Sequence, residues 1–393
     1  MTVGPDTRWM RHVPPESGAC SMDLFHAMAS LCGAGPHELP PEAHRLREDI
    51  GEARHYIFIL LDGLGMNLRD DYPKRGFFNS HFHRELRAMF PSTTTSVLVS
   101  LATGLWPAQH GIIGWFTHLP DAGFTSVPLL FNERFTATPL SDLGLDVHKV
   151  FPFQRRTDGY DRTVRFLSHK FLVDTPFGSW SRGAAQGIGF ENTQHAVELL
   201  ADALHSDTRP SYNYLYVSEL DHVEHRHGVR DPAVGEIIET LDGRLSHLRS
   251  VLDKDVRMIV STDHGHIEVP PENRFVVKEG DPLNACLEVP PSGEPRTPVF
   301  HVKPERNHDF LGILRDTLGC TFDAVSVDEA DGLRLFGPHA LSERARAHLG
   351  DWIGVTDEPY ALLYAPPGRE PIDFLGYHGG LSLDEMSIPL FLA

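Results

Sequence analysis

Three short apolar runs, each followed by an acidic residue, divide this chain of 393 residues. They read HYIFILLD from residue 55, YNYLYVSELD from residue 212 and RMIVSTD from residue 257. Unbroken apolar runs of this length, bounded by polar turns, are typical of strands that are buried on both faces of a parallel sheet. The pattern therefore predicts three buried strands that end in acidic side chains.

Amphipathic segments separate these runs and predict helices. Apolar positions recur at helical spacing in residues 191–206, 231–252 and 305–319. The segment FPSTTTSVLVSLATG, residues 90–104, places hydroxyl residues before an apolar stretch, as at the N-terminus of a capped helix. Strands that alternate with helices predict an α/β fold with a mostly parallel sheet.

Three regions depart from this alternation. Residues 1–53 contain several prolines and predict an N-terminal extension of helices and loops, which leaves 54–393 as the main domain. Within the main domain, the regions of about 116–190 and 268–365 lose the regular periodicity. We expect both of them to be inserted or capping regions outside the main sheet.

Carboxylate and imidazole side chains gather at the predicted strand ends, where α/β sheets bind their ligands. The set comprises Asp62, Asp221, His225, Asp263, His264 and, in the C-terminal loop, His378. Three carboxylates and three imidazoles suit two divalent metals, which can hold a phosphoryl group between them. Taken singly, Asp62 also fits a plain turn, and the histidine-rich stretch at Asp221 also fits a solvated helix start. An adjacent acid and imidazole at Asp263 and His264 would need a partner if buried.

The hydroxyl cluster Ser92, Thr93, Thr94 and Thr95 allows two interpretations. A hydroxyl at a helix N-terminus faces free backbone N–H groups and the positive end of the helix dipole. Next to a metal it would become a nucleophile. The alternative is that these residues only cap the helix.

Composition narrows the function classes. The chain has 35 basic and 54 acidic residues, a formal net charge of −19, and 24 histidines. Such a charge disfavours binding of a nucleic-acid polymer. Four cysteines without a C-x-x-C pair are no disulfide framework, and no apolar run has the length of a membrane span or a signal peptide. We therefore expect a cytoplasmic protein that does not associate with a membrane.

The motifs together resemble the alkaline phosphatase superfamily, and within it the branch of type I phosphodiesterases and nucleotide pyrophosphatases with their bacterial relatives. The resemblance covers the chain from about residue 55 to its end. The motifs are LLDGLG, FPSTTTSVLVSLATG followed by GLWPAQHGIIG, DHVEHRHG, STDHGH and YHGG. It implies a three-layer sandwich with an inserted cap, and hydrolysis of phosphodiester or nucleotide pyrophosphate bonds in a small anionic substrate.

The resemblance also implies a role for each position. One metal would be held by Asp221, His225 and His378, and the other by Asp62, Asp263, His264 and the hydroxyl oxygen of Thr94. Alignment on Thr103-Gly104 places the nucleophile at Thr94, with Thr93 and Thr95 as register alternatives. The two metals would be zinc, with manganese as the alternative, and the reaction would pass through a phosphothreonine.

Two positions depart from the family pattern. Glu224 replaces the glycine of D-x-x-G-H, which adds a charge beside the ligands. Trp115 stands at about the place where animal-type pyrophosphatases have an asparagine, so substrate contacts cannot be transferred from them. The predicted substrate-binding residues are Trp115, Arg155, Arg156 and Arg296, with His169 and Lys170 as further cations.

Two other hypotheses remain open. The same centre could hydrolyse phosphomonoesters or phosphonates, because diesterases and monoesterases differ only in what they accept around the phosphorus. The chain could also be a catalytically silent binding module, although all six metal ligands and the hydroxyl are present.

Overall fold

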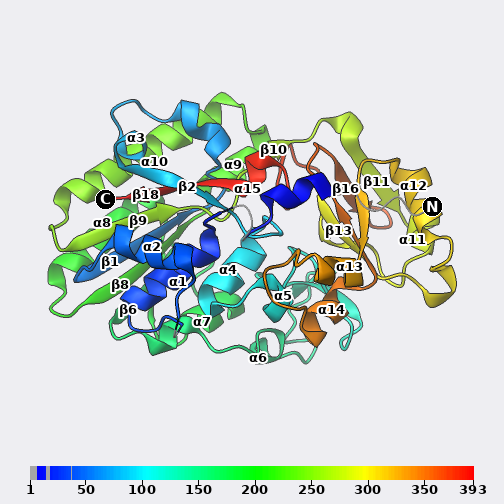
Figure 1. The fold of residues 1–393 in the computed structure, drawn as a ribbon, viewed down its shortest axis with the longest axis horizontal. Coiled ribbons are helices and arrows are strands. Elements are labelled where there is room, and N and C mark those ends of the chain that lie inside the picture. Colours follow the sequence, from blue (N-terminus) through cyan, green and yellow to red (C-terminus); the bar gives the residue numbers. More distant parts are fainter. Residues whose placement is uncertain (1–6, 15–17, 37) are drawn as a thin grey trace.

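The structure, a computed structural model, describes residues 7–14, 18–36 and 38–393 (Figure 1). A seven-stranded sheet with the order β2-β18-β9-β1-β8-β6-β7 forms its centre. The three predicted strands are neighbours in it: β1 (His55–Leu61) pairs in parallel with both β8 (Ser211–Val217) and β9 (Val256–Ser261). The prediction of a mostly parallel α/β sheet is therefore confirmed.

The remaining strands complete the sheet on both sides. Strands β6 (Thr163–His169) and β7 (Gln186–Phe190) extend it in parallel beyond β8. On the other side, β18 (Ser387–Leu392) runs antiparallel to both β9 and β2 (Phe82–Arg87). The sequence did not predict β6 and β7 as strands, because TVRFLSH and QGIGF interrupt their apolar residues with polar residues and glycines.

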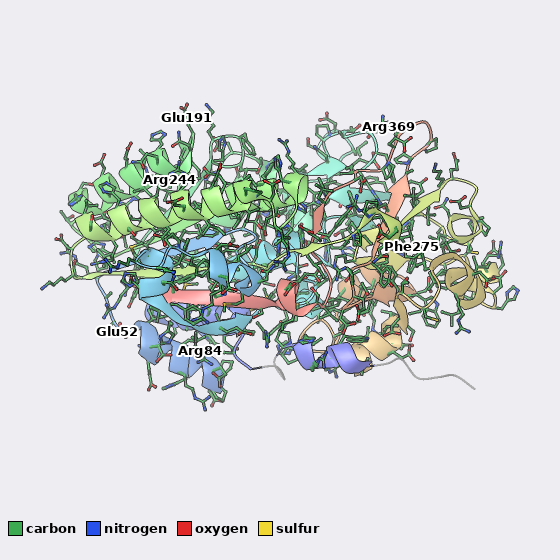
Figure 2. The ribbon with its side chains drawn as sticks, turned by 90° about the horizontal axis from the view of Figure 1, so that it is seen from above. Glu52, Arg84, Glu191, Arg244, Phe275 and Arg369 are labelled. Carbon is green, nitrogen blue, oxygen red and sulfur yellow. The ribbon has the colours of Figure 1, made fainter. Side chains whose placement is uncertain are left out.

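Helices cover both faces of the sheet, and β1 shows why its sequence is apolar throughout. Ile57, Ile59 and Leu61 pack on one face with α8 (Thr193–Ser206) and α10 (Pro232–Val251). Tyr56, Phe58 and Leu60 pack on the other with α1 (Ser21–Leu31) and α4 (Thr94–Thr103). The result is a three-layer sandwich. Figure 2 shows α10, which includes Arg244, lying along the layer above the sheet.

The N-terminal segment is integrated into this sandwich. Helix α1 contributes Leu24 and Phe25 to the core, and the ring of Phe25 meets that of Phe58 at 6.1 Å. Helix α2 (Pro41–Ile50) packs on α1. The predicted extension, residues 1–53, also includes residues 1–6, 15–17 and 37, which lie outside the described residues.

Two smaller units lie beside the sheet. The first contains a three-stranded sheet of β3 (Thr117–Leu119), β4 (Phe124–Val127) and β5 (Asn132–Glu133). Because β6 and β7 belong to the main sheet, this unit ends before Thr163 rather than at residue 190.

The second unit lies at the right of Figure 1 in yellow and orange. It holds a four-stranded sheet in the order β12 (Ser292–Glu294), β13 (Thr297–Phe300), β15 (Trp352–Val355) and β14 (Asp323–Ser326). Helix α12 (Phe310–Leu318) packs beside this sheet. Among the described residues, no helix combines the length and apolar character that crossing a bilayer requires.

The other elements are short. The helices are η1 (Thr7–His12), η2 (Met66–Asp71), α3 (Phe77–His81), α5 (Pro107–His110), α6 (Val147–Val150), η3 (Arg156–Gly159), α7 (Pro176–Arg182), α9 (Glu219–His227), η4 (Pro271–Asn273), α11 (Pro282–Ala285), η5 (Pro304–Arg306), α13 (Val327–Gly332), α14 (Glu343–Leu349) and α15 (Leu383–Met386). The strands are β10 (Ile267–Glu268), β11 (Arg274–Lys278), β16 (Ala361–Ala365) and β17 (Gly376–Tyr377).

Candidate metal centre

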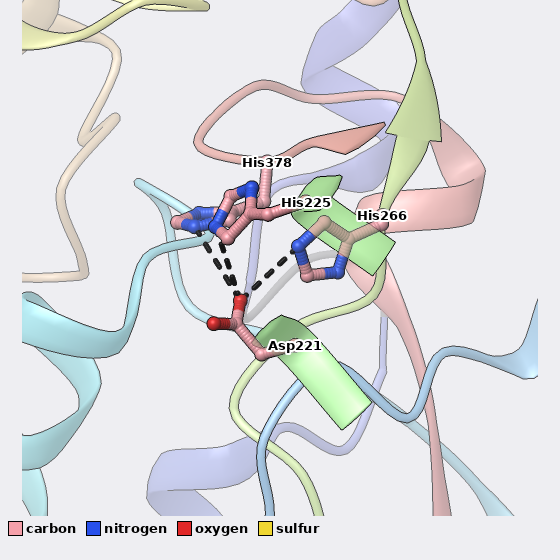
Figure 3. Close-up of side chains that lie close together, drawn as sticks. All are labelled: Asp221, His225, His266 and His378. Atoms are coloured by element: carbon pink, nitrogen blue, oxygen red, sulfur yellow. Dashed lines mark ion pairs between the residues drawn. The ribbon is translucent and has the colours of Figure 1, made fainter. Parts of the chain in front are cut away.

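Four side chains beyond the ends of β8 and β9 form a first group that could hold a metal ion (Figure 3). Asp221 and His225 lie one turn apart on α9, His266 follows β9, and His378 follows β17. The Nε2 atoms of His225 and His266 both lie 3.2 Å from Asp221 Oδ1, and that of His378 lies 4.0 Å away. Asp221 Oδ1 and His266 Nε2 are buried without a hydrogen-bond partner among the described residues. A cation bound beside Asp221 would satisfy its Oδ1.

The three imidazole rings of the first group are oriented by contacts at Nδ1. The carbonyl oxygen of Gly376 accepts from His225 Nδ1 at 2.8 Å, and that of Ser92 accepts from His378 Nδ1 at 3.0 Å. Because a carbonyl can only accept, Nδ1 carries a proton in both rings, which makes Nε2 the nitrogen available to a metal. His266 Nδ1 lies 3.0 Å from a carboxylate, that of Glu224. All three rings thus direct Nε2 toward Asp221.

A second group lies beside the first. It consists of Asp62 directly after β1, and Asp263 and His264 after β9. The Nε2 atom of His264 is 3.5 Å from Asp62 Oδ1 and 3.6 Å from Asp263 Oδ2. Tyr216 donates a hydrogen bond to Asp62, and Asp263 Oδ2 has no hydrogen-bond partner among the described residues. This oxygen-rich set also fits a divalent cation.

Charge in the two groups is set by burial and by the neighbouring side chains. Burial and the nearby Asp263 and Asp221 raise the pKa of Asp62 well above its usual range. Burial also disfavours the charged form of Asp221, but the imidazoles of His225 and His266 outweigh it and hold the pKa of Asp221 well below its usual range. Burial lowers the pKa of His264, and burial with the neighbouring imidazoles lowers that of His378. Neutral imidazoles are the form that binds metals.

The three threonines at the start of α4 have different surroundings. Thr94 Oγ1 lies 3.1 Å from His264 Nε2 and 3.4 Å from Asp62 Oδ1, at the first residue of the helix. Thr93 Oγ1 donates to Glu294 at 2.5 Å, and Thr95 Oγ1 is buried without a partner among the described residues. Of the three, only Thr94 contacts the second group and also lines the cavity described next.

A cavity of about 740 Å³ opens in front of both groups. Most of its wall is apolar or aromatic, including Trp115, Phe116, Phe166, Tyr212, Tyr214 and Tyr216. A cavity of this size can hold a small organic ligand with substituents on more than one side of its reacting group.

Of the predicted substrate-binding residues, Trp115 lines this cavity and the three arginines do not. Arg155 forms an ion pair with Asp158 at 2.8 Å. Arg156 contacts His26 Nδ1 at 2.8 Å and packs against Gly104, where an added Cβ would lie 1.7 Å from its guanidinium. Gly104 ends α4, so Arg156 lies at the opposite end of this helix from Thr94.

Arg296 is completely buried and has a structural partner. Its guanidinium donates to both carboxylate oxygens of Glu385, at 2.7 and 2.8 Å, and to the carbonyls of Glu358 and Tyr360. His169 and Lys170 also lie outside the cavity wall, bound to Glu191. The sequence could not separate these cations from substrate-binding ones, because every partner except Asp158 of Arg155 is distant in the chain.

Sequence reasoning missed His266, Glu224 and Arg134. His266 stands two residues after His264, and Glu224 stands at the departure from D-x-x-G-H, so both had a visible signal. The acid that departs from the motif meets a buried imidazole, since Glu224 lies 3.0 Å from His266 Nδ1. Arg134 lines the cavity but had no signal, since it lies in an irregular region.

The family comparison matches residues 56–380 to the model described as type I phosphodiesterase / nucleotide pyrophosphatase. Among solved structures, human ectonucleotide pyrophosphatase / phosphodiesterase 5 has a TM-score of 0.64 at 15% identity over 86% of this chain and 87% of its own. An inactive threonine-to-alanine variant of the murine protein, in complex with AMP, has a TM-score of 0.61 at 15% identity over 85% and 87% of the two chains.

Phosphonoacetate hydrolase from Sinorhizobium meliloti 1021, in complex with phosphonoacetate, has a TM-score of 0.60 at 17% identity over 86% of this chain and 90% of its own. These likenesses agree with the predicted alkaline-phosphatase-like sandwich. No curated protein matched the sequence. The family match spans most of the chain and includes every predicted metal ligand. The chain belongs to the family of type I phosphodiesterases and nucleotide pyrophosphatases, and is an enzyme of that hydrolase class.

Proposed function

We propose that this protein hydrolyses phosphodiester or nucleotide pyrophosphate bonds in a small substrate, with two bound metals and Thr94 as the nucleophile. The observation behind the proposal is the position of the Thr94 hydroxyl. It lies 3.1 Å from His264 Nε2 at the N-terminus of α4, beside the second group of potential ligands and at the wall of the cavity.

The residues present fit two divalent cations. The first would be held by Asp221, His225 and His378, and the second by Asp62, Asp263, His264 and the Thr94 oxygen. Bound there, the cations would neutralise phosphoryl oxygens and favour the deprotonated hydroxyl. We propose zinc because imidazoles dominate the first group, with manganese as the alternative at the carboxylate-rich second group.

The chain's own residues would prepare Thr94 for attack. The start of α4 directs backbone N–H groups at an anionic phosphoryl group. Tyr216 orients Asp62 beside the hydroxyl. The Thr94 oxygen would form the bond to phosphorus while the leaving oxygen departs with the bonding electrons and takes a proton from solvent. Water would then cleave the phosphothreonine and release phosphate product and free threonine.

The cavity favours diesters over monoesters as substrates. A diester needs space for a second substituent, and the largely apolar wall offers that space on the open side of the metal groups. Phosphonate hydrolysis is the second candidate, because the phosphonoacetate hydrolase is as similar in structure as the pyrophosphatases are.

The test compares bis-p-nitrophenyl phosphate, p-nitrophenyl phosphate and phosphonoacetate as substrates, each with zinc and with manganese. We expect the diester to be hydrolysed fastest. A preference for the monoester by orders of magnitude would refute diesterase activity, and a preference for phosphonoacetate would select the second candidate. Fewer than one metal per chain, with no turnover after metal addition, would indicate a silent binding module.

Thr94→Ala tests the nucleophile. We expect turnover to fall by about 10³-fold or more while metal content is largely kept, since Asp62, Asp263 and His264 remain. Thr103→Ala, at the other end of α4, is the matched control, because among the described residues the Thr103 hydroxyl bonds only the Val99 carbonyl and the Leu105 N–H. Unchanged activity in Thr94→Ala would move the nucleophile to Thr93 or Thr95.

A further inference from the structure

Arg134 follows β5 and lines the cavity beside an aromatic cluster. Its guanidinium carbon lies 3.8 Å from the ring centroid of Phe116, 4.9 Å from that of Phe135 and 5.8 Å from that of Tyr364. Nη1 donates to the carbonyl of Pro291. These contacts fix the plane of the guanidinium, and its Nε and Nη2 form no hydrogen bond to the described residues.

No carboxylate forms an ion pair with Arg134 among the residues described. The charges of Glu133 and Glu294 favour its charged form from farther away, and the Glu133 carboxylate is hydrogen-bonded within its own turn. The Glu133 carboxylate accepts from the backbone N–H groups of Phe135 and Thr136, at 3.0 and 2.6 Å. Burial lowers the pKa of Arg134 to about 10, so the side chain is still a cation at neutral pH.

Other arginines of the cavity wall are satisfied or solvated. Arg182 forms an ion pair with Asp174 at 3.0 Å, and Arg226 and Arg369 are exposed. A partly buried cation without an ion-pair partner is costly, and an anion bound from outside would offset that cost. Among these arginines, Arg134 therefore has the surroundings expected of a residue that binds an anionic ligand.

A short path of contacts links Arg134 to the reacting end of the cavity. Phe116, under the guanidinium, is paired through its backbone with Gly293. The flanking residues Trp115 and Glu294 are joined by a hydrogen bond from the Trp115 N–H to Glu294, which also accepts from Thr93. Thr93 precedes Thr94, so Arg134 and the proposed nucleophile line one cavity from neighbouring segments.

We propose that Arg134 binds a second anionic group of the substrate, a carboxylate or a phosphate, while the reacting phosphoryl group occupies the metal centre. The assignment rests on the proposed function of that centre. Two free N–H groups in a fixed plane match the two oxygens of a carboxylate or phosphate. The low polarity of the aromatic wall strengthens the attraction between the charges. The substrate class is thus a small phosphate or phosphonate compound with a second negative charge.

Matched pairs of ligands test this by calorimetry on the metal-loaded protein. Methylphosphonate and phosphonoacetate differ by a carboxylate, and phosphate and pyrophosphate differ by a second phosphoryl group. We expect the wild-type protein to bind at least one of the two ligands with the added anionic group more tightly than its partner without that group. In Arg134→Met we expect that preference to fall by about 10- to 100-fold, with methylphosphonate and phosphate unaffected. Whichever pair responds identifies the second anion.

Arg369→Met is the matched control, since Arg369 also lines the cavity but is exposed at the outer edge of the molecule (Figure 2). Metal content and circular dichroism of each variant show that the site is intact. Equal weakening of all four ligands in Arg134→Met, or an unchanged preference, would overturn the proposal. Binding does not require turnover, so failure of the proposed hydrolysis would be seen separately, in the substrate assays.

Discussion

At the scale of single residues, Glu224, which departs from the family motif, contacts His266. Both side chains are completely buried, and the His266 ring lies between Glu224 and Asp221. Burial disfavours the imidazolium, but Glu224, with Asp221, outweighs it and raises the pKa of His266 to about 10. Gly63 makes room for this arrangement, because an added Cβ there would lie 2.6 Å from Glu224 and its φ is +86°. The additional pair supports Asp221 from the side away from the cavity.

His266→Gln tests that support. We expect the affinity for the more tightly bound metal to fall by about 10- to 100-fold, which is the usual loss when a residue that orients a metal ligand is removed. Glu224→Gln should lower this affinity by a smaller factor. Competition with a chromogenic chelator measures the affinity. His227→Gln is the control, because His227 lies on the same helix but is exposed. Equal affinity in His266→Gln and wild type would show that the pair is not needed for metal binding.

At the scale of elements, a buried ion pair joins the second small unit to the chain segment that presents His378. Arg296 lies between β12 and β13, and Glu385 lies in α15. Glu385 also accepts hydrogen bonds from the backbone of Gly380 and Ser382, directly after His378. The ion pair therefore fixes this loop relative to β13, which explains why Arg296 is unavailable to a substrate.

Arg296→Met should destabilise the protein by about 3–5 kcal/mol, because it leaves the Glu385 carboxylate buried and unpaired. The double variant Arg296→Met/Glu385→Gln should recover part of this loss, since no charge is then buried. Urea unfolding followed by circular dichroism gives both free energies. Arg54→Met is the control, as its ion pair with Asp255 is exposed and should contribute at most about 1 kcal/mol. A loss in Arg296→Met no larger than in Arg54→Met would contradict the structural role.

At the scale of the whole molecule, many of the 24 histidines are structural rather than catalytic. His110, His301 and His348 are buried away from both metal groups. Burial lowers the pKa of His301 to about 4 and those of His110 and His348 to about 3. In His110 the geometry agrees, because Nδ1 accepts from the Ile112 N–H and cannot also carry a proton.

These histidines predict sensitivity to acid. Their folded pKa values lie below the usual 6.5, so the unfolded chain binds more protons, and the stability present above pH 6.5 is lost as pH falls toward about 4. Each group contributes at most about 1.4 kcal/mol per pH unit. His110→Asn keeps an acceptor for Ile112 but cannot be protonated, so its stability relative to wild type should rise as pH falls. Urea unfolding at pH 7 and pH 5 measures this, and a constant difference between the two proteins would contradict it.

Local patterns were enough to predict the centre of the fold. Apolar runs at β1, β8 and β9 predicted neighbouring parallel strands because a strand buried on both faces must be apolar throughout. The acidic residues after them predicted the sheet edge at which the ligand groups meet. The first small unit ends earlier than predicted, because β6 and β7 belong to the main sheet. These two strands are mostly half-buried or exposed, so their sequences lack the continuous apolar run of β1.

Sequence by itself determined the fold class, the family motifs and the set of side chains at the carboxyl edge of the sheet. These follow from residue type and spacing within one segment. Only the tertiary structure decided which threonine meets Asp62 and His264, which arginine faces the cavity, and that His266 joins the first group. Each of these depends on contacts between segments far apart in the chain. Whether a cation stabilises the fold or remains available to a ligand depends on its burial and on its ion-pair partner. Arg296, which is paired with Glu385, is an example of the first case, and we propose Arg134 as an example of the second.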